Sequence, residues 1–248
     1  MKNSPYNLIH VFVALLCLSP MVFGQGLKAF WQQFVHGLPQ NLTPERLFSM
    51  LLMQSGYFAA MLLILWGSTF IPRLPRSPSA PVRVEPPPPV DRRRGVVLAL
   101  RLAVPVILVA IALNLLGTKS IEWLTGVQPA EQELVKCFLD PAYSLGMRAF
   151  LVFSVVVLAP AGEELIFRGI IFRGLAKKLP LFAAMLVSGF VFALVHINAA
   201  SFVAVWFLGV AFAWLYARTR TILAPMSMHA AFNLANVVLL IFFPELAG

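Results

Sequence analysis

Two adjacent glutamates lie inside a hydrophobic stretch that is long enough to cross a membrane. Residues 151–172 read LVFSVVVLAPAGEELIFRGIIF, with Glu163 and Glu164 near the middle and Arg168 one turn later. A charged side chain at the centre of a bilayer costs roughly 2.5–3.5 kcal/mol even on insertion-based scales. These carboxylates therefore have to face a protein interior or a wet cavity, and such residues usually mark a functional site.

The composition places the rest of the chain in the membrane class. The 248 residues are 60% hydrophobic and 12% charged, whereas a soluble domain is about a quarter charged. At about 20 residues per span, the predicted fold class is all-α, a polytopic transmembrane helical bundle of about seven spans, or about six if the N-terminal segment is cleaved. The net charge of +9 comes from basic residues that flank apolar spans, which indicates membrane topology and no nucleic-acid partner.

The chain divides into three predicted regions. Residues 1–71 hold the N-terminal spans with an interfacial segment, and the first apolar stretch fits either a signal peptide or, as we favour, a membrane anchor. Residues 72–95 are rich in proline and arginine and predict an extended linker, because proline removes backbone donors and restricts the backbone. Residues 96–248 form the predicted transmembrane core, which carries the polar motifs within 145–243.

Apolar runs and positive charges predict the spans and their orientation. A third span covers residues 95–117, a polar loop of about 25 residues follows, and four more spans begin near Gly146, Leu179, Ser201 and Ile222. Most lysines and arginines then fall on the side of the N-terminus and the linker, so we expect both to be cytoplasmic. The expected location is a membrane, of the bacterial inner-membrane type.

The spacing of the charged residues separates the two glutamates. Glu164 and Arg168 are four residues apart with the acid first, which favours an ion pair on one helix face. Glu163 points about 100° away around the same helix and has no partner at helical spacing. An unpaired carboxylate in a low-dielectric site can act as an acid or base near neutral pH. We therefore predict a chemical role for Glu163 and supporting roles for Glu164 and Arg168.

Two later segments carry polar residues at membrane depth. His196 lies near the far end of the fifth span, while His229 and Asn233 are four residues apart on the seventh and share one face. Imidazole and carboxamide donors in a dry cavity suit the stabilisation of an oxyanion. Together with a carboxylate, they could activate a water and hold the tetrahedral intermediate of peptide or amide hydrolysis. Each motif alone also fits a structural hydrogen bond between helices.

Counting along the helices raises a question of depth. At 1.5 Å per residue, Glu163 lies about 20 Å, His196 about 25 Å and His229 about 10 Å from the inner ends of their helices. One site needs one depth, so helix tilt or shifted helix ends must remove the difference.

The ordered motifs Glu163-Glu164-x-x-x-Arg168, Phe192-x-x-x-His196 and His229-x-x-x-Asn233 resemble those of the CPBP family. These are the CAAX-processing and bacteriocin-processing intramembrane proteases, also called the Abi family. The resemblance covers residues 145–243 and implies an endopeptidase that acts within the bilayer on a membrane-associated protein or peptide. Carried over by position, Glu163 would be the general base, His196 would help to hold the water, and His229 and Asn233 would form the oxyanion hole.

The cofactor is left open between none and zinc. Members of the resembled family are often named metalloproteases, and Glu163, His196 and His229 are of the types that zinc accepts as ligands. The chain lacks HExxH, however, and asparagine is a poor zinc ligand. We therefore favour a glutamate-dependent mechanism with no obligatory metal.

Two other functions fit the same residues. A catalytically inactive member could serve in bacteriocin immunity or hold a partner protein. A transporter or proton relay also uses buried glutamate and histidine, although the chain has no internal repeat of the transporter kind.

Overall fold

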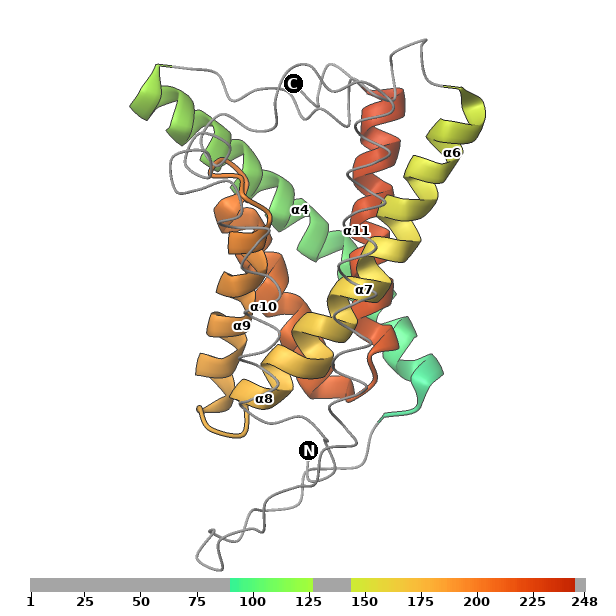
Figure 1. Ribbon diagram of the computed structural model, residues 1–248, viewed down its shortest axis with the longest axis vertical. Helices are drawn as coiled ribbons and strands as arrows, with labels where there is room; N and C mark the ends of the chain where they lie inside the picture. The colour runs from blue at the N-terminus through green and yellow to red at the C-terminus, as the bar shows by residue number, and fades with distance from the viewer. Residues whose placement is uncertain (1–89, 127–143, 244–248) are drawn as a thin grey trace, which may run out of the picture.

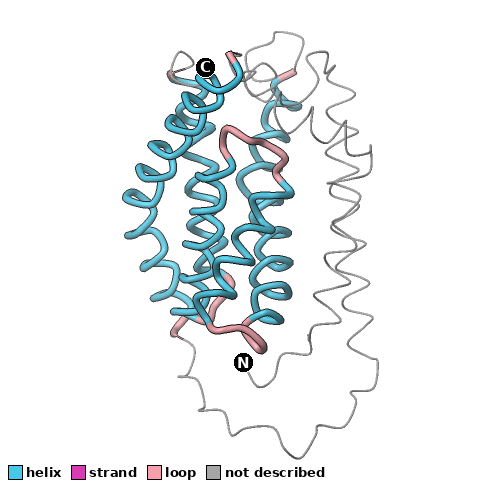
Figure 2. The backbone as a smooth tube through the Cα atoms, turned by 90° about the vertical axis from the view of Figure 1, so that its left-hand side faces the viewer, coloured by secondary structure: helices cyan, strands magenta, loops and turns pink. Residues whose placement is uncertain are grey.

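The computed structural model describes residues 90–126 and 144–243, and all regular structure in these ranges is helical. The predicted all-α fold class is therefore confirmed for this part of the chain. The helices are α4 (Arg92–Thr125), α6 (Leu145–Phe153), η1 (Ser154–Leu158), α7 (Ala159–Ile166), η2 (Phe167–Phe172), α8 (Arg173–Leu175), α9 (Leu181–Val195), α10 (Phe202–Thr219) and α11 (Leu223–Phe242). Figures 1 and 2 show a helical bundle in which α9 and α11 run close to the long axis of the molecule, while α4 and the stretch from α6 to α8 cross it obliquely.

Four helical stretches in the described ranges are long and apolar enough to cross a membrane. They are Arg92–Thr125, the continuous run Leu145–Leu175 from α6 to α8, Phe202–Thr219 and Leu223–Phe242. The apolar α9 is shorter than these four, at 15 residues. These five stretches correspond to the third to seventh predicted spans. The first two spans, the interfacial segment and linker residues 72–89 lie outside the described residues, so the total of about seven spans stays a prediction.

The third span extends beyond both predicted ends. Its helix begins at Arg92, so the last four residues of the predicted linker are helical, because the side chain of Asp91 caps the helix by accepting a hydrogen bond from the Arg94 amide. At the other end the helix continues to Thr125, through eight residues of the predicted polar loop. Lys119 and Glu122 form an ion pair there on the helix surface. The helix ends where Gly126 adopts the left-handed conformation.

The fourth span contains two π-helical segments, η1 and η2, on either side of α7. Such wide turns leave backbone carbonyls that need other donors, and in membrane helices side chains of neighbouring helices often supply them. Pro160 has no amide hydrogen, and the Val155 carbonyl accepts instead from the Asn233 side chain of α11. Likewise, the Phe167 carbonyl accepts from the buried Ser188 hydroxyl of α9. These two bonds hold α9 and α11 in register with the fourth span.

Helices α9 and α10 approach closely at a pair of glycines. A Cβ atom built on Gly189 would lie 2.9 Å from the amide nitrogen of Val210, and one built on Gly209 would lie 2.7 Å from the Cα of Gly189. Small residues allow such contacts between backbones in membrane helices, where close packing supplies much of the association energy. The glycine pair thereby sets how closely α10 approaches α9.

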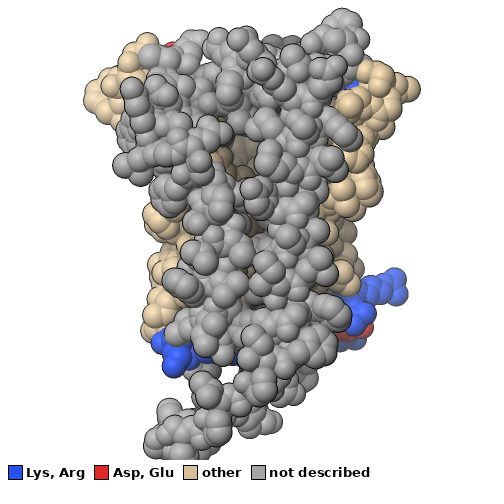
Figure 3. All heavy atoms as spheres, in the orientation of Figure 1, with Lys and Arg blue, Asp and Glu red and all other residues tan. Residues whose placement is uncertain are grey.

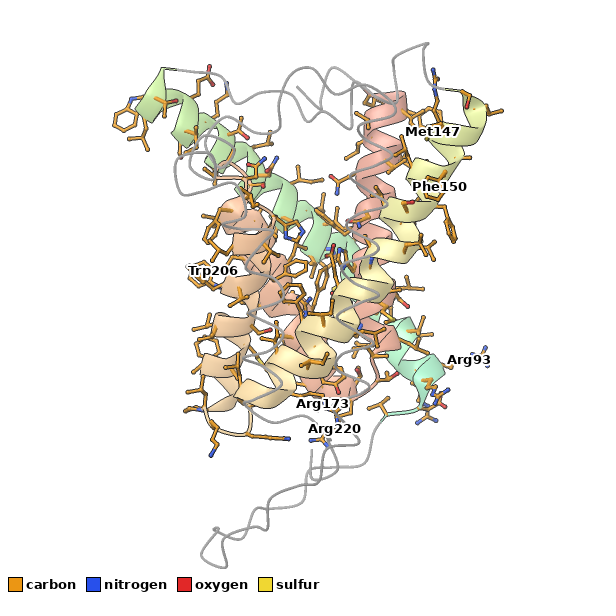
Figure 4. The ribbon with its side chains drawn as sticks, in the orientation of Figure 1. Arg93, Met147, Phe150, Arg173, Trp206 and Arg220 are labelled. Atoms are coloured by element: carbon orange, nitrogen blue, oxygen red, sulfur yellow. The ribbon has the colours of Figure 1, made fainter. Side chains whose placement is uncertain are left out.

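Basic side chains gather at one end of the described bundle. Figure 3 shows lysine and arginine atoms at the lower end of the visible face, and Figure 4 places Arg93, Arg173 and Arg220 there. Three helices that are far apart in sequence thus share a basic end, as the predicted orientation requires. Along α4, by contrast, Val104 and Leu116 are about two-thirds exposed, as is common for residues that face lipid.

We predict that Gly189→Ala destabilises the bundle by roughly 1–3 kcal/mol, because the added methyl group meets backbone atoms of α10 that cannot move aside. Thermal unfolding of the purified protein in detergent measures the loss. The matched control is Gly169→Ala, where the added Cβ meets only the Glu164 carbonyl of its own helix at 3.9 Å. An equal loss of stability in both variants would contradict the close contact at Gly189.

Candidate active site

The structure brings Glu163 together with both predicted histidines. The Glu163 Oε2 atom lies 3.9 Å from Nε2 of His196 and 3.8 Å from Nε2 of His229. These three side chains come from α7, the end of α9 and α11. The difference in depth expected from helix counting is therefore removed in the folded bundle, in which the fourth span runs obliquely across the other helices (Figure 1).

The Glu163 carboxylate is buried without a hydrogen-bond donor on Oε2. Its side chain is 11% exposed, and the distances to the two histidines are too long for direct hydrogen bonds. A buried polar atom without a partner is costly, so it usually marks a place where water or a ligand binds. The separation of Glu163 from any ion partner on its own helix is as the sequence predicts.

Glu164 and Arg168 form the predicted ion pair, and it is completely buried. Arg168 Nη1 donates to Glu164 Oε1 at 2.8 Å, and Arg168 Nη2 donates to the Gly209 carbonyl of α10 at 3.0 Å. The same Glu164 oxygen lies 3.1 Å from His229 Nδ1. Glu164 therefore supports more than the ion pair, since it also holds one of the two histidines that face Glu163. Helical spacing within one span could not reveal this contact.

Hydrogen bonds at Nδ1 determine which nitrogen of each histidine faces Glu163. His196 Nδ1 donates to the Phe192 carbonyl at 2.7 Å, and His229 Nδ1 donates to the Glu164 carboxylate, because neither oxygen can donate in return. In the neutral rings both Nε2 atoms are then acceptors. Three acceptor atoms thus converge, and their arrangement calls for a group that carries protons or positive charge.

His196 is placed by the abrupt end of α9. It is the C-terminal cap residue of that helix, and the next residue, Ile197, has a φ of 49° in the left-handed region. A β-branched residue rarely adopts this conformation. Asn198 then accepts from the Ser201 amide at the start of α10, which closes the short connection. The imidazole is therefore held at a helix end, with about a third of its side chain exposed.

Aromatic rings enclose the buried arginine and one histidine. The Arg168 guanidinium carbon lies 4.6 Å from the ring centre of Phe192 and 5.0 Å from that of Phe212. Phe212 also stacks on the His229 ring, with centroids 4.9 Å apart and planes 23° apart. The motif residue Phe192 contacts the rings of both His196 and His229. Phe212 was not predicted from the sequence, since α10 is rich in aromatic residues and nothing in their spacing distinguishes it.

Asn233 lies one helical turn beyond His229, and its described hydrogen bond points away from Glu163. Its Nδ2 atom donates to the Val155 carbonyl at 2.7 Å. A carboxamide has two amide hydrogens, so the second one can still donate elsewhere. Among the described residues, Asn233 makes no hydrogen bond to Glu163, His196 or His229, and its place in an oxyanion hole stays a prediction.

The three side chains that would ligate zinc if a metal were bound, Glu163, His196 and His229, lie farther apart in the structure than the ligands of a tetrahedral zinc site. Zinc bonds of about 2.0 Å in a tetrahedral site separate the ligand atoms by about 3.3 Å, whereas here the Glu163 oxygen lies 3.8 and 3.9 Å from the nitrogens. Within residues 90–126 and 144–243, no group of three or more histidine, cysteine, aspartate or glutamate side chains could hold a metal ion.

Comparison with known families agrees with the motif resemblance. Residues 145–235 match the family model described as type II CAAX prenyl endopeptidase Rce1-like. The matched stretch runs from α6 into α11 and contains every residue of the three motifs. This part of the chain is therefore similar to the CAAX prenyl endopeptidases, and the resemblance predicted from the motifs is confirmed.

Among curated proteins, the chain is 34% identical over 120 residues to the "Putative membrane peptidase YdiL" of Bacillus subtilis (strain 168). The similarity covers 48% of this chain and 48% of that protein, so the chain spans about half the length of the curated relative that it matches. No solved structure matches the chain.

We predict that Glu164→Gln destabilises the protein by about 3–5 kcal/mol, because Arg168 would remain buried without its counter-charge. Chemical unfolding of the purified variant in mixed micelles measures this loss. Glu163→Gln is the matched control: it makes the same chemical change one residue earlier, where Oε2 accepts no hydrogen bond. If the two variants unfold alike, the Glu164 network does not stabilise the bundle.

Proposed function

We propose that this chain is an intramembrane endopeptidase of the CPBP type that uses Glu163 to activate water. The observation that carries the proposal is the convergence of a buried, unbonded carboxylate oxygen with two histidine acceptors within 3.9 Å. A single water at about 2.8 Å can reach two acceptors separated by this distance. The family match and the membrane-peptidase relative support the same reaction class.

In the proposed first step, Glu163 Oε2 removes one proton from the water, while a histidine Nε2 accepts a hydrogen bond from the hydrogen that stays on the water oxygen. The water oxygen bonds to the peptide carbonyl carbon, and the carbonyl π electrons move to the oxygen to form an oxyanion. The second Nδ2 hydrogen of Asn233 is our proposed donor to that oxyanion. His229 could add a donor at Nε2 only as the doubly protonated ring, since its Nδ1 hydrogen is already bonded to Glu164.

In the second step the proton held by Glu163 passes to the nitrogen of the scissile bond. The oxyanion electrons reform the carbonyl, the carbon–nitrogen bond breaks, and an amine and a carboxylic acid leave. Glu163 returns to its ionised form, so it serves first as base and then as acid. Because Glu164 and Arg168 neutralise each other nearby, one negative charge moves during the reaction, from Glu163 to the oxyanion and back to Glu163.

The proposed substrate is a membrane-associated protein or peptide, because the reacting residues lie inside a bundle of apolar helices. We place the protein in a membrane of the bacterial inner-membrane type, with the basic end and the N-terminus toward the cytoplasm. The shared basic end of α4, α8 and the α10–α11 turn supports this orientation through the positive-inside rule.

We predict that Glu163→Gln abolishes cleavage of a quenched peptide library by the detergent-solubilised protein, while the variant stays folded and inserted in the membrane. An amide cannot accept the water's proton, so the first step is lost. Fluorescence release measures cleavage, and thermal unfolding checks the fold. Wild-type turnover by this variant would remove Glu163 from the mechanism.

The same assay separates the remaining hypotheses. Turnover that is unchanged by a chelator is expected for the glutamate mechanism, whereas its loss and recovery with added zinc would restore the metal hypothesis. If the folded wild-type protein cleaves no peptide, either in detergent or in vesicles, the result would favour a catalytically inactive scaffold or immunity protein.

We predict that Asn233→Ala lowers kcat by about 10²–10³-fold with little change in KM, because an oxyanion donor acts in the transition state. Steady-state kinetics on a cleaved library peptide measures both constants. The control is Asn236→Ala on the same helix, where the exposed side chain donates only to the Phe232 carbonyl of its own helix. A change confined to KM would make Asn233 a substrate contact.

A further inference from the structure

One ring of the site has an orientation that its hydrogen bond alone does not explain. His229 is bonded through Nδ1 to Glu164 Oε1, and one such bond fixes the direction of one ring atom. The imidazole is also attached through Cβ, so its remaining freedom is a combined rocking about χ1 and χ2 that keeps Nδ1 within reach of Glu164. Such rocking would move Nε2 relative to Glu163, and a contact on the face of the ring would limit it.

Phe212 supplies that contact. Its ring is fully buried and stacks on the His229 ring at a centroid distance of 4.9 Å and an interplanar angle of 23°. The Arg168 guanidinium carbon lies 5.0 Å from the centre of the same phenyl ring. Phe212 thus contacts both groups that donate to Glu164, and it is itself held in place by the arginine. A cation over an aromatic face is attracted to the ring, and the attraction is greater where water is absent.

Phe192 also contacts the His229 ring, but it does so through an edge contact and not by stacking. Its ring meets His229 nearly edge to face, with planes 82° apart and centroids 5.8 Å apart. Its ring also lies 4.6 Å from Arg168 and 6.2 Å from Phe212. The edge contact limits how far the imidazole can slide, but a stacked face is what restricts its rotation.

We propose that Phe212 is a positioning residue that holds the His229 imidazole in the plane that directs Nε2 at Glu163. It lies outside the three motifs and contacts the reacting atoms only through His229. The kinetic part of this inference rests on the proposed function, whereas the placement of the His229 ring does not.

The experiment compares three variants of the full-length protein with the wild type. Phe212→Leu keeps an apolar side chain but removes the flat face, and Phe212→Tyr restores the face. Phe172→Leu is the matched control, because Phe172 is equally buried but its ring pairs with Tyr216 away from the site. Two quantities are measured: kcat and KM on a cleaved peptide, and the NMR signals of isotope-labelled histidine side chains, with His229 assigned by substitution.

We expect Phe212→Leu to lower kcat by about 10–10²-fold at nearly constant KM, since small misplacements of reacting groups cost about this much. Phe212→Tyr should recover most of the rate, and Phe172→Leu should lose stability without losing kcat. The His229 signals should shift or broaden in Phe212→Leu and stay unchanged in Phe172→Leu.

The two measurements distinguish the failure of this inference from the failure of the proposed function. If the wild type cleaves nothing but the His229 signals respond as expected, the positioning role holds and the protease assignment fails. If folded Phe212→Leu keeps its His229 signals, or if both leucine variants lower kcat equally, Phe212 does not position the histidine.

Discussion

The rest of the structure depends on a charge pair buried in the middle of an apolar bundle. Glu164 and Arg168 have no solvent exposure, and removing two charges from water is costly unless both are fully paired and hydrogen-bonded. Here further partners come from three helices: the Gly209 carbonyl of α10, the His229 imidazole of α11 and the faces of aromatic rings from α9 and α10, while Glu164 Oε2 and Arg168 Nε make no hydrogen bond among the described residues. Separating these helices would remove the hydrogen bonds and ring contacts that α9, α10 and α11 give to the buried pair, so the pair links these three helices to the fourth span at one level.

The same network makes two adjacent glutamates chemically different. Both carboxylates have an Oε2 atom without a hydrogen bond, but Glu164 Oε1 receives donors from Arg168 and His229, whereas Glu163 Oε2 faces two histidine acceptors. The difference follows from the 100° step of the helix, which turns one carboxylate toward the arginine and the other toward the histidines. A stable ion pair and a reactive acid can therefore occupy neighbouring positions. Glu164 of the ion pair bonds to the His229 ring, and Glu163 faces the other nitrogen of that ring.

Much of the local structure could be predicted from short-range patterns. The Glu164–Arg168 pair followed from its spacing, and the starts of the last four spans were predicted to within about two residues of the observed helices. The ends of α4 were missed, since a capping aspartate and a surface ion pair extend a helix past the apolar run on which the prediction relied. The π-helical segments were also missed. In these segments the backbone carbonyls of Val155 and Phe167 accept hydrogen bonds from side chains of other helices, and no local sequence pattern indicates such bonds.

The sequence by itself determined the membrane class, the three ordered motifs and which polar residues share a helix face, because apolar length and helical periodicity are properties of a single segment. Only the tertiary structure decided that Glu163, His196 and His229 meet at one depth and that Nε2 of each histidine faces the carboxylate. It also selected Phe212 from the many aromatic residues of α10. The physical reason is that convergence depends on how helices tilt and pack against one another, and a sequence gives positions along and around each helix separately.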